Sequence, residues 1–439
     1  MSASTSDLRV LKVGICGYGT VGRGTHDLLV KNESTIARRL DCIHLTVTHV
    51  ASRSLSGTVF GVGKWSTDPI EVVNDPEVDI VVEAIGGLGT AFEVVKKALS
   101  AKKNVVTANK ALIATHGNEL VNLASENGVR LLFESAVAGG IPILKCLREG
   151  LAANNINWLA GIINGTGNYI LTEMGNRQRL FSEVLREAQA LGYAEADPSF
   201  DVEGTDAAHK LAIMASIAFG MPLAFDKTYI EGISSLELDD IKYANELGYC
   251  IKHLGIARLS DQRVQMRVHP SLISSDELLA SVDGVGNAVV VNADPIGSTL
   301  YSGPGAGAEA TASAVVADLI DLARSPRSIS QAHIVPSLGF SRLVTDFEIL
   351  DIDKIESEYY LRINVEDHVG VMANITGLME KFEISIDAVI QKEKSKNCVQ
   401  IVILTQMCVE QVLNSVIAEI ENLKSVRSSV VRIRVASFE

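Results

Sequence analysis

The strongest constraint on the fold of this chain is a glycine pattern near its start, Gly17-Tyr-Gly19-Thr-Val-Gly22. The pattern follows an apolar run over residues 10–16, typical of a buried parallel strand, and opens a helical stretch that extends to about residue 40. In that context the glycines permit a tight turn and bring backbone amides close to a pyrophosphate at the helix N-terminus. The alternative is a tight turn that binds no ligand. We expect a dinucleotide site, contacted by Gly17, Gly19, Thr20, Val21 and Gly22.

Strands and helices alternate after this loop, which is the pattern of a doubly wound parallel sheet. The expected strands cover residues 44–51, 79–84, 104–107 and 129–133, and the expected helices cover 91–99 and 119–127. Gly139-Gly140-Ile-Pro142 then interrupts the pattern before an amphipathic helix that ends near residue 151. A mixed region follows, with strands at 158–163, 264–269 and 288–292, and helices at 181–190, 205–220 and 309–324.

The end of the chain predicts a separate arrangement. Residues 325–356 read as a linker because they contain prolines and an acid-rich stretch. From residue 359 the order of elements is βαββαβ, which is ferredoxin-like. The fold class is therefore α/β. We expect a Rossmann-type domain over residues 1–140 (completed by about 308–340), an α+β substrate and dimerisation domain over 141–307, the 325–356 linker, and a ferredoxin-like domain over 357–439.

Composition narrows the classes of function. The chain has 439 residues, too many for one core, and a formal net charge of -14 without a basic stripe, so we expect no nucleic-acid partner. The N-terminus lacks the apolar stretch of a signal peptide, and no apolar run is long enough to span a bilayer. The six cysteines show neither metal-ligand nor disulfide spacing. A soluble cytoplasmic protein with free thiols and no membrane partner is expected.

The end of the second strand indicates which dinucleotide binds. NAD sites usually carry an acid there, whereas this strand ends Val50-Ala-Ser-Arg53-Ser54. Arg53 can face the 2′-phosphate of NADP, and Lys64 can assist it. The alternative is a solvated surface arginine. We therefore expect NADP to be preferred, with NAD possible.

Lysines and carboxylates gather in two further motifs. Lys110 ends Thr107-Ala-Asn-Lys110, just after the fourth strand, where ligands bind in parallel sheets. Lys210 lies one helical turn after Asp206, downstream of Glu195 and Asp201. A positioned lysine can donate the proton that a carbonyl needs when it receives a hydride, and clustered acids suit an amino-acid ammonium. The alternatives are a solvated Lys110 and an exposed Asp206–Lys210 ion pair that contributes little. His209 reads as a structural histidine.

These motifs, together with Ala138-Gly-Gly-Ile-Pro142, Asn164-Gly-Thr166 and Gly192-Tyr-Ala-Glu-Ala-Asp-Pro198, occur in an order that resembles homoserine dehydrogenase over about residues 8–340. The tail, with Asp367-His-Val-Gly370-Val-Met, resembles an ACT domain. The whole is similar to the monofunctional, ACT-tailed type. One position departs from the family, which usually has a second threonine where Gly167 stands; we expect the glycine to be tolerated.

The resemblance implies specific roles. Lys210 would be the proton donor, and Lys110 the second active-site lysine, which also touches the cofactor. Glu195 and Asp206 would bind homoserine, with Asp201 beside them, and Gly192 and Gly307 would border the cofactor. The resemblance also implies a bound sodium or potassium ion at four positions of this chain. Three of these residues are apolar or glycine, so they would contact the ion through their backbone carbonyl oxygens, which hard cations accept as ligands. Those positions are Glu134, Val137, Gly139 and Ile141.

The expected reaction is the reversible NAD(P)-dependent reduction of L-aspartate 4-semialdehyde to L-homoserine, in threonine and methionine biosynthesis. The alternatives are a dehydrogenase of another small amino or keto acid, and an amino-acid-sensing regulatory protein without catalysis. Threonine is the expected effector, and removal of the tail after about Ile355 is expected to abolish the response to threonine while sparing catalysis. The alternative is a tail that only assembles subunits. We expect a homodimer or homotetramer. The expected regulatory residues are Asp367, Val369, Gly370, Val371 and Asn374.

Overall fold

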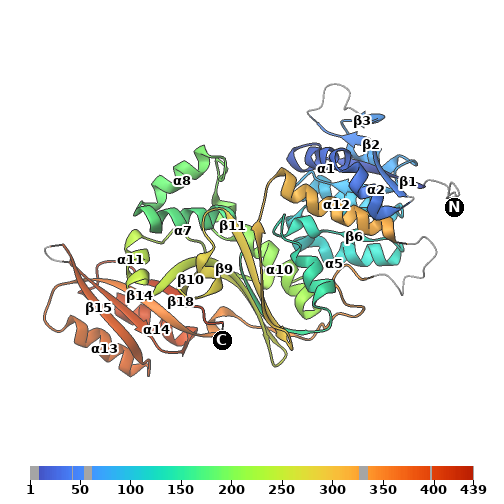
Figure 1. Ribbon diagram of the computed structural model, residues 1–439. Helices are drawn as coiled ribbons and strands as arrows, with labels where there is room; N and C mark the ends of the chain where they lie inside the picture. Colours follow the sequence, from blue (N-terminus) through green and yellow to red (C-terminus); the bar gives the residue numbers. More distant parts are fainter. Residues whose placement is uncertain (1–8, 42, 54–61, 326–334, 396–397, 439) are drawn as a thin grey trace. The chain divides into compact units, whose positions relative to one another are not determined.

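The computed structural model describes residues 9–41, 43–53, 62–325, 335–395 and 398–438 (Figure 1). The chain divides into two compact units. The first unit comprises Met1–Asn157, His209–Asp226 and Val291–Phe347, and the second comprises Trp158–Ala208, Lys227–Val290 and Glu348–Glu439.

The first unit is built on a six-stranded sheet whose order is β3-β2-β1-β4-β5-β6. All neighbouring strands in it run parallel, so the predicted doubly wound sheet is confirmed. The short strand β3 was not predicted. The strands are β1 (Arg9–Cys16), β2 (Ile43–Ala51), β3 (Lys64–Ser66), β4 (Ile80–Glu83), β5 (Asn104–Thr107) and β6 (Leu131–Leu132).

Helices flank this sheet (Figure 1). The expected single helix up to residue 40 is two helices, and α5 begins at Lys110 rather than at residue 119. Helix α12 packs on α1, and its Val315 and Leu319 share a buried core with Val13 and Ile15 of β1, so the late helix completes the first unit. The helices are α1 (Thr20–Lys31), α2 (Glu33–Leu40), α3 (Pro69–Asn74), α4 (Gly89–Ser100), α5 (Lys110–Glu126), α6 (Ile143–Lys145, continued by a π-helical turn, Cys146–Gly150) and α12 (Ala308–Arg324).

The second unit contains a mixed sheet in which strands run in the order β11-β7-β9-β10-β18-β14-β16-β15. Strand β9 was not predicted, nor were helices α7 and α11. The strands before the C-terminal segment are β7 (Asn155–Ile162), β8 (Tyr229–Ile230), β9 (Tyr249–Ser260), β10 (Arg263–Ser274) and β11 (Gly286–Asp294), and β12 (Gly297–Pro304) follows them in the chain. The helices are α7 (Gly165–Arg177), α8 (Phe181–Ala190), α9 (Ser199–Val202) and α11 (Leu238–Glu246). Helix α10 (Thr205–Phe219) starts in this unit and belongs to the first unit from His209 onward, and β12 also belongs to the first unit.

The C-terminal segment has the predicted βαββαβ order, and its four long strands pair antiparallel in the order β18-β14-β16-β15. We call residues 356–435 the C-terminal fold. Two short strands accompany it, β13 (Glu348–Ile349) and β17 (Cys408–Val409). Its main elements are β14 (Glu356–Glu366), α13 (Val371–Lys381), β15 (Ile386–Ser395), β16 (Cys398–Thr405), α14 (Glu410–Glu421) and β18 (Val431–Val435).

The C-terminal fold shares its core with the rest of the second unit. Strand β18 pairs in parallel with β10, so that Arg434 lies opposite Ser271. Tyr360 and Ile433 of the C-terminal fold belong to the same buried cluster as Tyr169 and Met174 of α7. The compact units therefore differ from the expected division, which separated residues 141–307 from residues 357–439.

The described residues also bear on the expectations about membranes and thiols. Within the ranges given above, no helix is sufficiently long and apolar to cross a membrane. Five of the six cysteines are free thiols, and Cys42 lies outside the described residues. The five are Cys16, Cys146, Cys250, Cys398 and Cys408.

Candidate active site

The three glycines of the first loop each have a distinct steric role. Gly17 has a φ of 95°, and a Cβ there would lie 2.4 Å from the carbonyl oxygen of Ala84. A Cβ on Gly22 would lie 2.0 Å from the carbonyl oxygen of Gly17, whereas a Cβ on Gly19 would meet nothing within 4 Å. Gly17 and Gly22 thus permit the tight turn and the close packing of helix on strand, and Gly19 leaves space for a ligand.

The N-terminus of α1 is suited to a phosphate group. Gly19 is its N-cap residue and provides no side-chain hydrogen bond, and the first turn contains no acid. The amide groups of Thr20, Val21 and Gly22 therefore lack a capping side chain, and they lie at the positive end of the helix dipole. This geometry agrees with the predicted pyrophosphate site.

Arg53 and Lys64 differ in their surroundings. Arg53 is exposed just beyond β2 and has no ion-pair partner within the described part of the chain. The Lys64 ammonium, in contrast, lies 3.0 Å from Asp75 Oδ2 and 3.2 Å from Glu77 Oε2, and hydrogen bonds to these carboxylates raise its pKa. Because the charge of Lys64 is already compensated, Arg53 is the better candidate to bind a 2′-phosphate.

A buried carboxylate organises the loops at the ends of β4 and β5. Glu83 is fully buried, and burial raises its pKa. Its Oε1 accepts the backbone N–H of Ile85 at 2.7 Å, and its Oε2 accepts the hydroxyl of Thr107 at 2.5 Å. The Thr107 oxygen in turn accepts the N–H of Asn109 at 3.0 Å. Sequence reasoning missed Glu83, which fixes the start of the Thr107–Lys110 motif.

Lys110 is the first residue of α5 and is half-buried. Asn109 caps this helix, since its Oδ1 accepts the N–H of Leu112 at 3.1 Å, and its Nδ2 donates to the carbonyl of Gly87 at 2.7 Å. The lysine is thus held at the carboxyl end of β5, the edge at which parallel sheets bind ligands.

Lys210 and Asp206 are both carried by α10 and are both buried, with 8% and 4% of their surfaces exposed. This burial contradicts the alternative of an exposed ion pair. The neighbouring His209 stacks on Phe225 with ring centroids 4.2 Å apart, which supports its interpretation as a structural histidine.

One asparagine holds two of the predicted acids in the second unit. The Asn164 Nδ2 group donates to Asp201 Oδ1 at 2.7 Å and to Asp206 Oδ2 at 2.8 Å. Its Oδ1 accepts the N–H of Gly167 at 2.7 Å and so caps α7. Two adjacent carboxylates are suited to a cationic ligand such as an ammonium group. Sequence reasoning did not assign this positioning role to Asn164.

The remaining substrate and cofactor candidates lie at exposed positions. The Glu195 side chain is exposed, and its backbone carbonyl accepts Gln189 Nε2 at 3.1 Å. Gly192 and Gly307 both have positive φ angles, 76° and 119°, and a Cβ on either would meet nothing within 4 Å. At Gly167 a Cβ would make only ordinary contacts, the nearest at 3.4 Å, so the departure from the family pattern is sterically mild.

Glu134 has an unsatisfied oxygen in the interior of the first unit. The side chain is buried, and its Oε1 accepts the N–H of Leu144 at 3.0 Å, whereas its Oε2 has no hydrogen-bond partner among the described residues. Burial, and then the nearby Asp318, raise the pKa of Glu134 to about 8. A buried acid without a partner is a costly arrangement that a cation would relieve.

The backbone next to Glu134 supplies further oxygens. The carbonyls of Val137 and Gly139 accept no hydrogen bond within the described residues, and that of Ile141 accepts only the N–H of Ile143. Gly139 has a φ of 30°, and a Cβ on it would lie 2.8 Å from the carbonyl oxygen of Gly305. The same described residues contain no cluster of His, Cys, Asp and Glu that fits a metal ion. Oxygen ligands of this kind fit a hard monovalent cation rather than a transition metal.

Comparisons with known proteins identify the family to which the chain is similar. A family model described as "Homoserine dehydrogenase, NAD binding domain" matches residues 17–134, and one described as "Homoserine dehydrogenase" matches residues 142–320. The homoserine dehydrogenase of Pseudomonas aeruginosa is 53% identical over 98% of this chain and 99% of its own length. That of Neisseria gonorrhoeae is 49% identical over 98% of this chain and 100% of its own length.

Solved structures agree as well. A homoserine dehydrogenase from Thiobacillus denitrificans is 49% identical, covers 98% of each chain and superposes with a TM-score of 0.92. A hyperthermophilic archaeal homoserine dehydrogenase in complex with NADPH is 28% identical, covers 76% of this chain and 100% of that one, and has a TM-score of 0.60. The family models and the near full-length identity lead to one conclusion: this chain belongs to the homoserine dehydrogenase family.

Proposed function

We propose that this chain, an NAD(P)-dependent oxidoreductase, reduces L-aspartate 4-semialdehyde reversibly to L-homoserine with the residue roles set out below. The observation that carries these roles is the pair of carboxylates, Asp201 and Asp206, held by Asn164, with Lys210 further along the same helix as Asp206. The test is NADPH oxidation with aspartate semialdehyde, against a panel of other small aldehydes and keto acids. Turnover of another panel member in its place would refute the substrate assignment.

The proposed steps follow from the chemistry of each side chain. When bound, a reduced nicotinamide would supply the hydride that the aldehyde carbon accepts. The carbonyl electron pair moves to the oxygen, and Lys210 gives that oxygen its proton while Lys110 stabilises the developing negative charge. Asp206 and Glu195 bind the substrate ammonium, with Asp201 beside them, and so orient the carbonyl. In the reverse direction Lys210 accepts the proton from the homoserine hydroxyl.

The preferred cofactor is NADP in this proposal, because β2 ends without an acid and Arg53 is exposed beyond it. We expect Arg53→Ala to raise the KM for NADPH by about tenfold, the loss of one charge-assisted hydrogen bond. The KM for NADH should stay almost unchanged, since NADH lacks the 2′-phosphate. Steady-state kinetics with both cofactors measure this, with Lys64→Ala for comparison. Equal effects of Arg53→Ala on both cofactors would exclude the assignment.

A sodium or potassium ion is proposed at Glu134 and the carbonyls of Val137, Gly139 and Ile141. The folded-state pKa of Glu134, about 8, exceeds the ordinary value of 4.5, so the folded protein binds more protons between these pH values. Without a cation, stability should therefore fall as pH rises from about 4.5 to 8. A bound cation should offset this loss because it favours the ionised carboxylate.

The matching experiment measures Tm at pH 8.5 in potassium chloride, sodium chloride and choline chloride of equal ionic strength. We expect the small cations to raise the Tm of the wild type by several degrees, of the order that 1 kcal/mol produces in a domain. Glu134→Gln should have a higher Tm than the wild type in choline chloride and should lose the response to sodium or potassium. A variant that responds like the wild type would place the cation elsewhere or nowhere.

Threonine is the proposed effector, and the exposed loop before α13 is its proposed contact. Gly370 is the N-cap of α13 with a φ of 91°, and a Cβ there would meet nothing within 4 Å. Asp367, Val369 and Asn374 are exposed around it, and Val371 begins the helix. We also propose that the chain forms a homodimer or homotetramer, because the ACT domains that the tail resembles bind amino acids at the interface between paired domains.

We expect Gly370→Glu to abolish inhibition by threonine at millimolar-range concentrations, on the order of weak-ligand affinities, while kcat is retained. The glutamate side chain would fill the loop, and the backbone there is strained for any residue other than glycine. Gly377→Glu, within α13 and also open to solvent, is the matched control and should keep the inhibition. If the wild type ignores threonine, or Gly370→Glu is inhibited normally, the regulatory proposal fails.

A further inference from the structure

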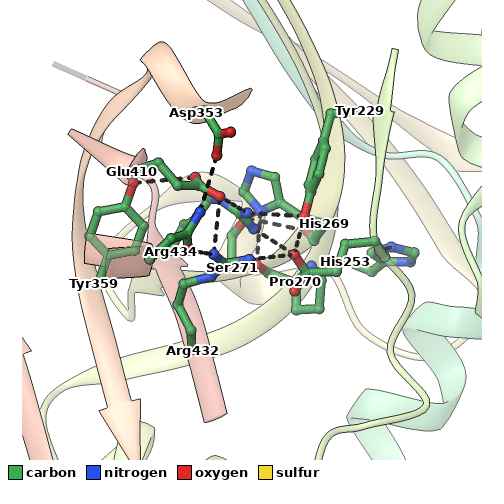
Figure 2. Close-up of polar contacts among 12 residues, drawn as sticks. Tyr229, His253, His269, Pro270, Ser271, Asp353, Tyr359, Glu410, Arg432 and Arg434 are labelled. Atoms are coloured by element: carbon green, nitrogen blue, oxygen red, sulfur yellow. Dashed lines mark hydrogen bonds and ion pairs between the residues drawn. The ribbon is translucent and has the colours of Figure 1, made fainter. Parts of the chain in front are cut away.

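A buried ion cluster joins the C-terminal fold to residues 229–234, which we call the 229–234 loop (Figure 2). Arg434 of β18 is 1% exposed, and its Nη1 donates to Glu231 Oε2 at 2.8 Å. Its Nε donates to Glu410 Oε2 at 2.7 Å, and its Nη2 donates to the hydroxyl of Tyr229 at 3.2 Å. One guanidinium thus binds a carboxylate of its own fold and a carboxylate of the loop.

Glu231 is a second carboxylate partner for Arg434, and it comes from outside the C-terminal fold. Arg434 is already paired with Glu410, and both side chains are 1% exposed. Burial opposes the charge of Glu231, but Arg434 outweighs it, so the pKa of Glu231 is lowered and the carboxylate stays ionised. Tyr229 also donates its hydroxyl to Glu231 Oε2 at 2.7 Å. The charge on Glu231 therefore ties the loop to β18, in addition to the backbone pairing of its first two residues, β8, with β10 and the hydrogen bond from the N–H of Glu231 to the Val268 carbonyl at 2.8 Å.

The 229–234 loop in turn lies directly on the turn at residues 202–204. The N–H of Ile233 donates to the carbonyl of Val202 at 2.9 Å. A Cβ on Gly232 would lie 2.7 Å from both the Val202 carbonyl oxygen and the Glu203 Cα, so the two backbones are in contact. There is no room for the loop to move toward this turn without displacing it.

That turn lies between the two proposed substrate acids in the chain. Asp201 precedes Val202 at the end of α9, and Asp206 is the second residue of α10. Asn164 donates one hydrogen bond to each carboxylate, which holds them together. The route from Arg434 to these acids therefore has three steps: an ion pair to Glu231, the backbone of the 229–234 loop, and the 202–204 turn.

We propose that Arg434 and Glu231 are positioning residues for the amino-acid substrate, through which the C-terminal fold sets the placement of Asp201 and Asp206. The proposal rests on the substrate-binding role proposed for these acids. A purely structural role predicts lower stability and no selective effect on one substrate. A positioning role predicts weaker binding of the amino acid with unchanged binding of the dinucleotide, since the glycine loop belongs to the first unit.

The test uses the full-length chain in the homoserine oxidation direction. Glu231→Gln removes the charge and keeps the size, and we expect it to raise the KM for L-homoserine about tenfold, the worth of one hydrogen bond to a charged group. The KM for NADP should change less than about twofold. Gly232→Ala tests the next step without touching an ion pair, because its Cβ would press on the 202–204 turn, and it should show the same selective rise.

The matched control is Arg362→Gln, which breaks another buried ion pair of the C-terminal fold. Arg362 Nε lies 2.6 Å from Asp240 Oδ1 of α11, and both side chains are fully buried. This variant should lose stability but keep the KM for homoserine. An unchanged KM for homoserine in Glu231→Gln overturns the proposal. If Glu231→Gln does not fold, an unchanged KM in Gly232→Ala overturns it instead. An equal rise in the KM of Arg362→Gln also overturns it. A wild type that does not oxidise homoserine would instead overturn the proposed function.

Discussion

Replacing Lys210 by alanine is expected to lower kcat by about a hundredfold or more, the scale on which one general acid contributes to a reaction. Lys210 is buried on α10, with 8% of its surface exposed, and the alanine side chain carries no acidic proton to replace its ammonium. The substrate would still be oriented by Asp206 and Glu195 in the proposed mechanism. The KM for homoserine should therefore change far less than kcat.

The measurement is steady-state kinetics of the purified variant in both directions, with thermal unfolding to establish that it is folded. His209→Gln is the control, since His209 is adjacent on α10, equally buried and in contact with the Phe225 ring. That variant should keep kcat within a few-fold even if its stability falls, because stacking contributes about 1 kcal/mol. A Lys210→Ala enzyme with near-normal kcat would remove Lys210 from the mechanism.

The sequence predicted the first unit well because its signals are local. The glycine loop lies between a strand and a helix, and each parallel strand is a short apolar run bounded by turn residues. The steric demands found at Gly17 and Gly22 are those that the motif predicts. The boundary of α5 was misplaced, since Lys110-Ala-Leu-Ile reads as the end of a loop until the Asn109 cap is known.

Strand β9 was missed because its sequence lacks a strand signal of its own. Its central residues are buried, including Lys252 and His253, and charged residues in a run argue against a buried strand. They are tolerated because Lys252 Nζ donates to the Val282 carbonyl at 2.7 Å and His253 lies 2.9 Å from the Glu231 carbonyl. These partners are distant in the sequence, so local pattern analysis cannot supply them.

Some residues of the candidate site could be predicted from local sequence motifs, and others could not. The motifs named Lys110, Asp206 and Lys210 through spacing and resemblance. Glu83 and Asn164 act through hydrogen bonds to side chains 24 to 42 positions away, and Glu134 meets Asp318 across 184 positions. Only the folded chain brings such pairs together, and no composition or period encodes them.

The second large effect concerns the C-terminal fold, for which the structure reverses an expectation drawn from the sequence. Truncation after Ile355 was expected to spare catalysis, as a separable domain would allow. In the structure, Tyr360 and Ile433 instead pack in one buried hydrophobic cluster with Tyr169 and Met174. It also pairs β18 with β10 along the sheet. We now expect the truncated chain to lose both its folded second unit and its activity.

The expected loss follows from what truncation would leave behind. Asp240 is fully buried and accepts hydrogen bonds from Arg362 at 2.6 and 3.0 Å, so removal of Arg362 leaves a buried carboxylate without its cation. Removing one partner of a buried pair costs about 3–5 kcal/mol, and the exposed apolar cluster adds to this. Since folded proteins are stable by only about 5–15 kcal/mol, the remaining chain should not fold cooperatively.

Circular dichroism, thermal unfolding and kcat of the truncated chain check this expectation, beside full-length Gly370→Glu. The point variant changes only an exposed loop of the C-terminal fold and should unfold cooperatively with normal kcat. The truncated chain should be insoluble or lack a cooperative transition. If it is soluble, unfolds in one transition and keeps near wild-type kcat, the C-terminal fold is a separable module, and the buried contacts of Tyr360 and Arg362 contribute little to the second unit. If only Gly370→Glu is active, both folding and regulation depend on the C-terminal fold. Loss of threonine inhibition can then be assigned to effector binding only when it is measured in a full-length variant.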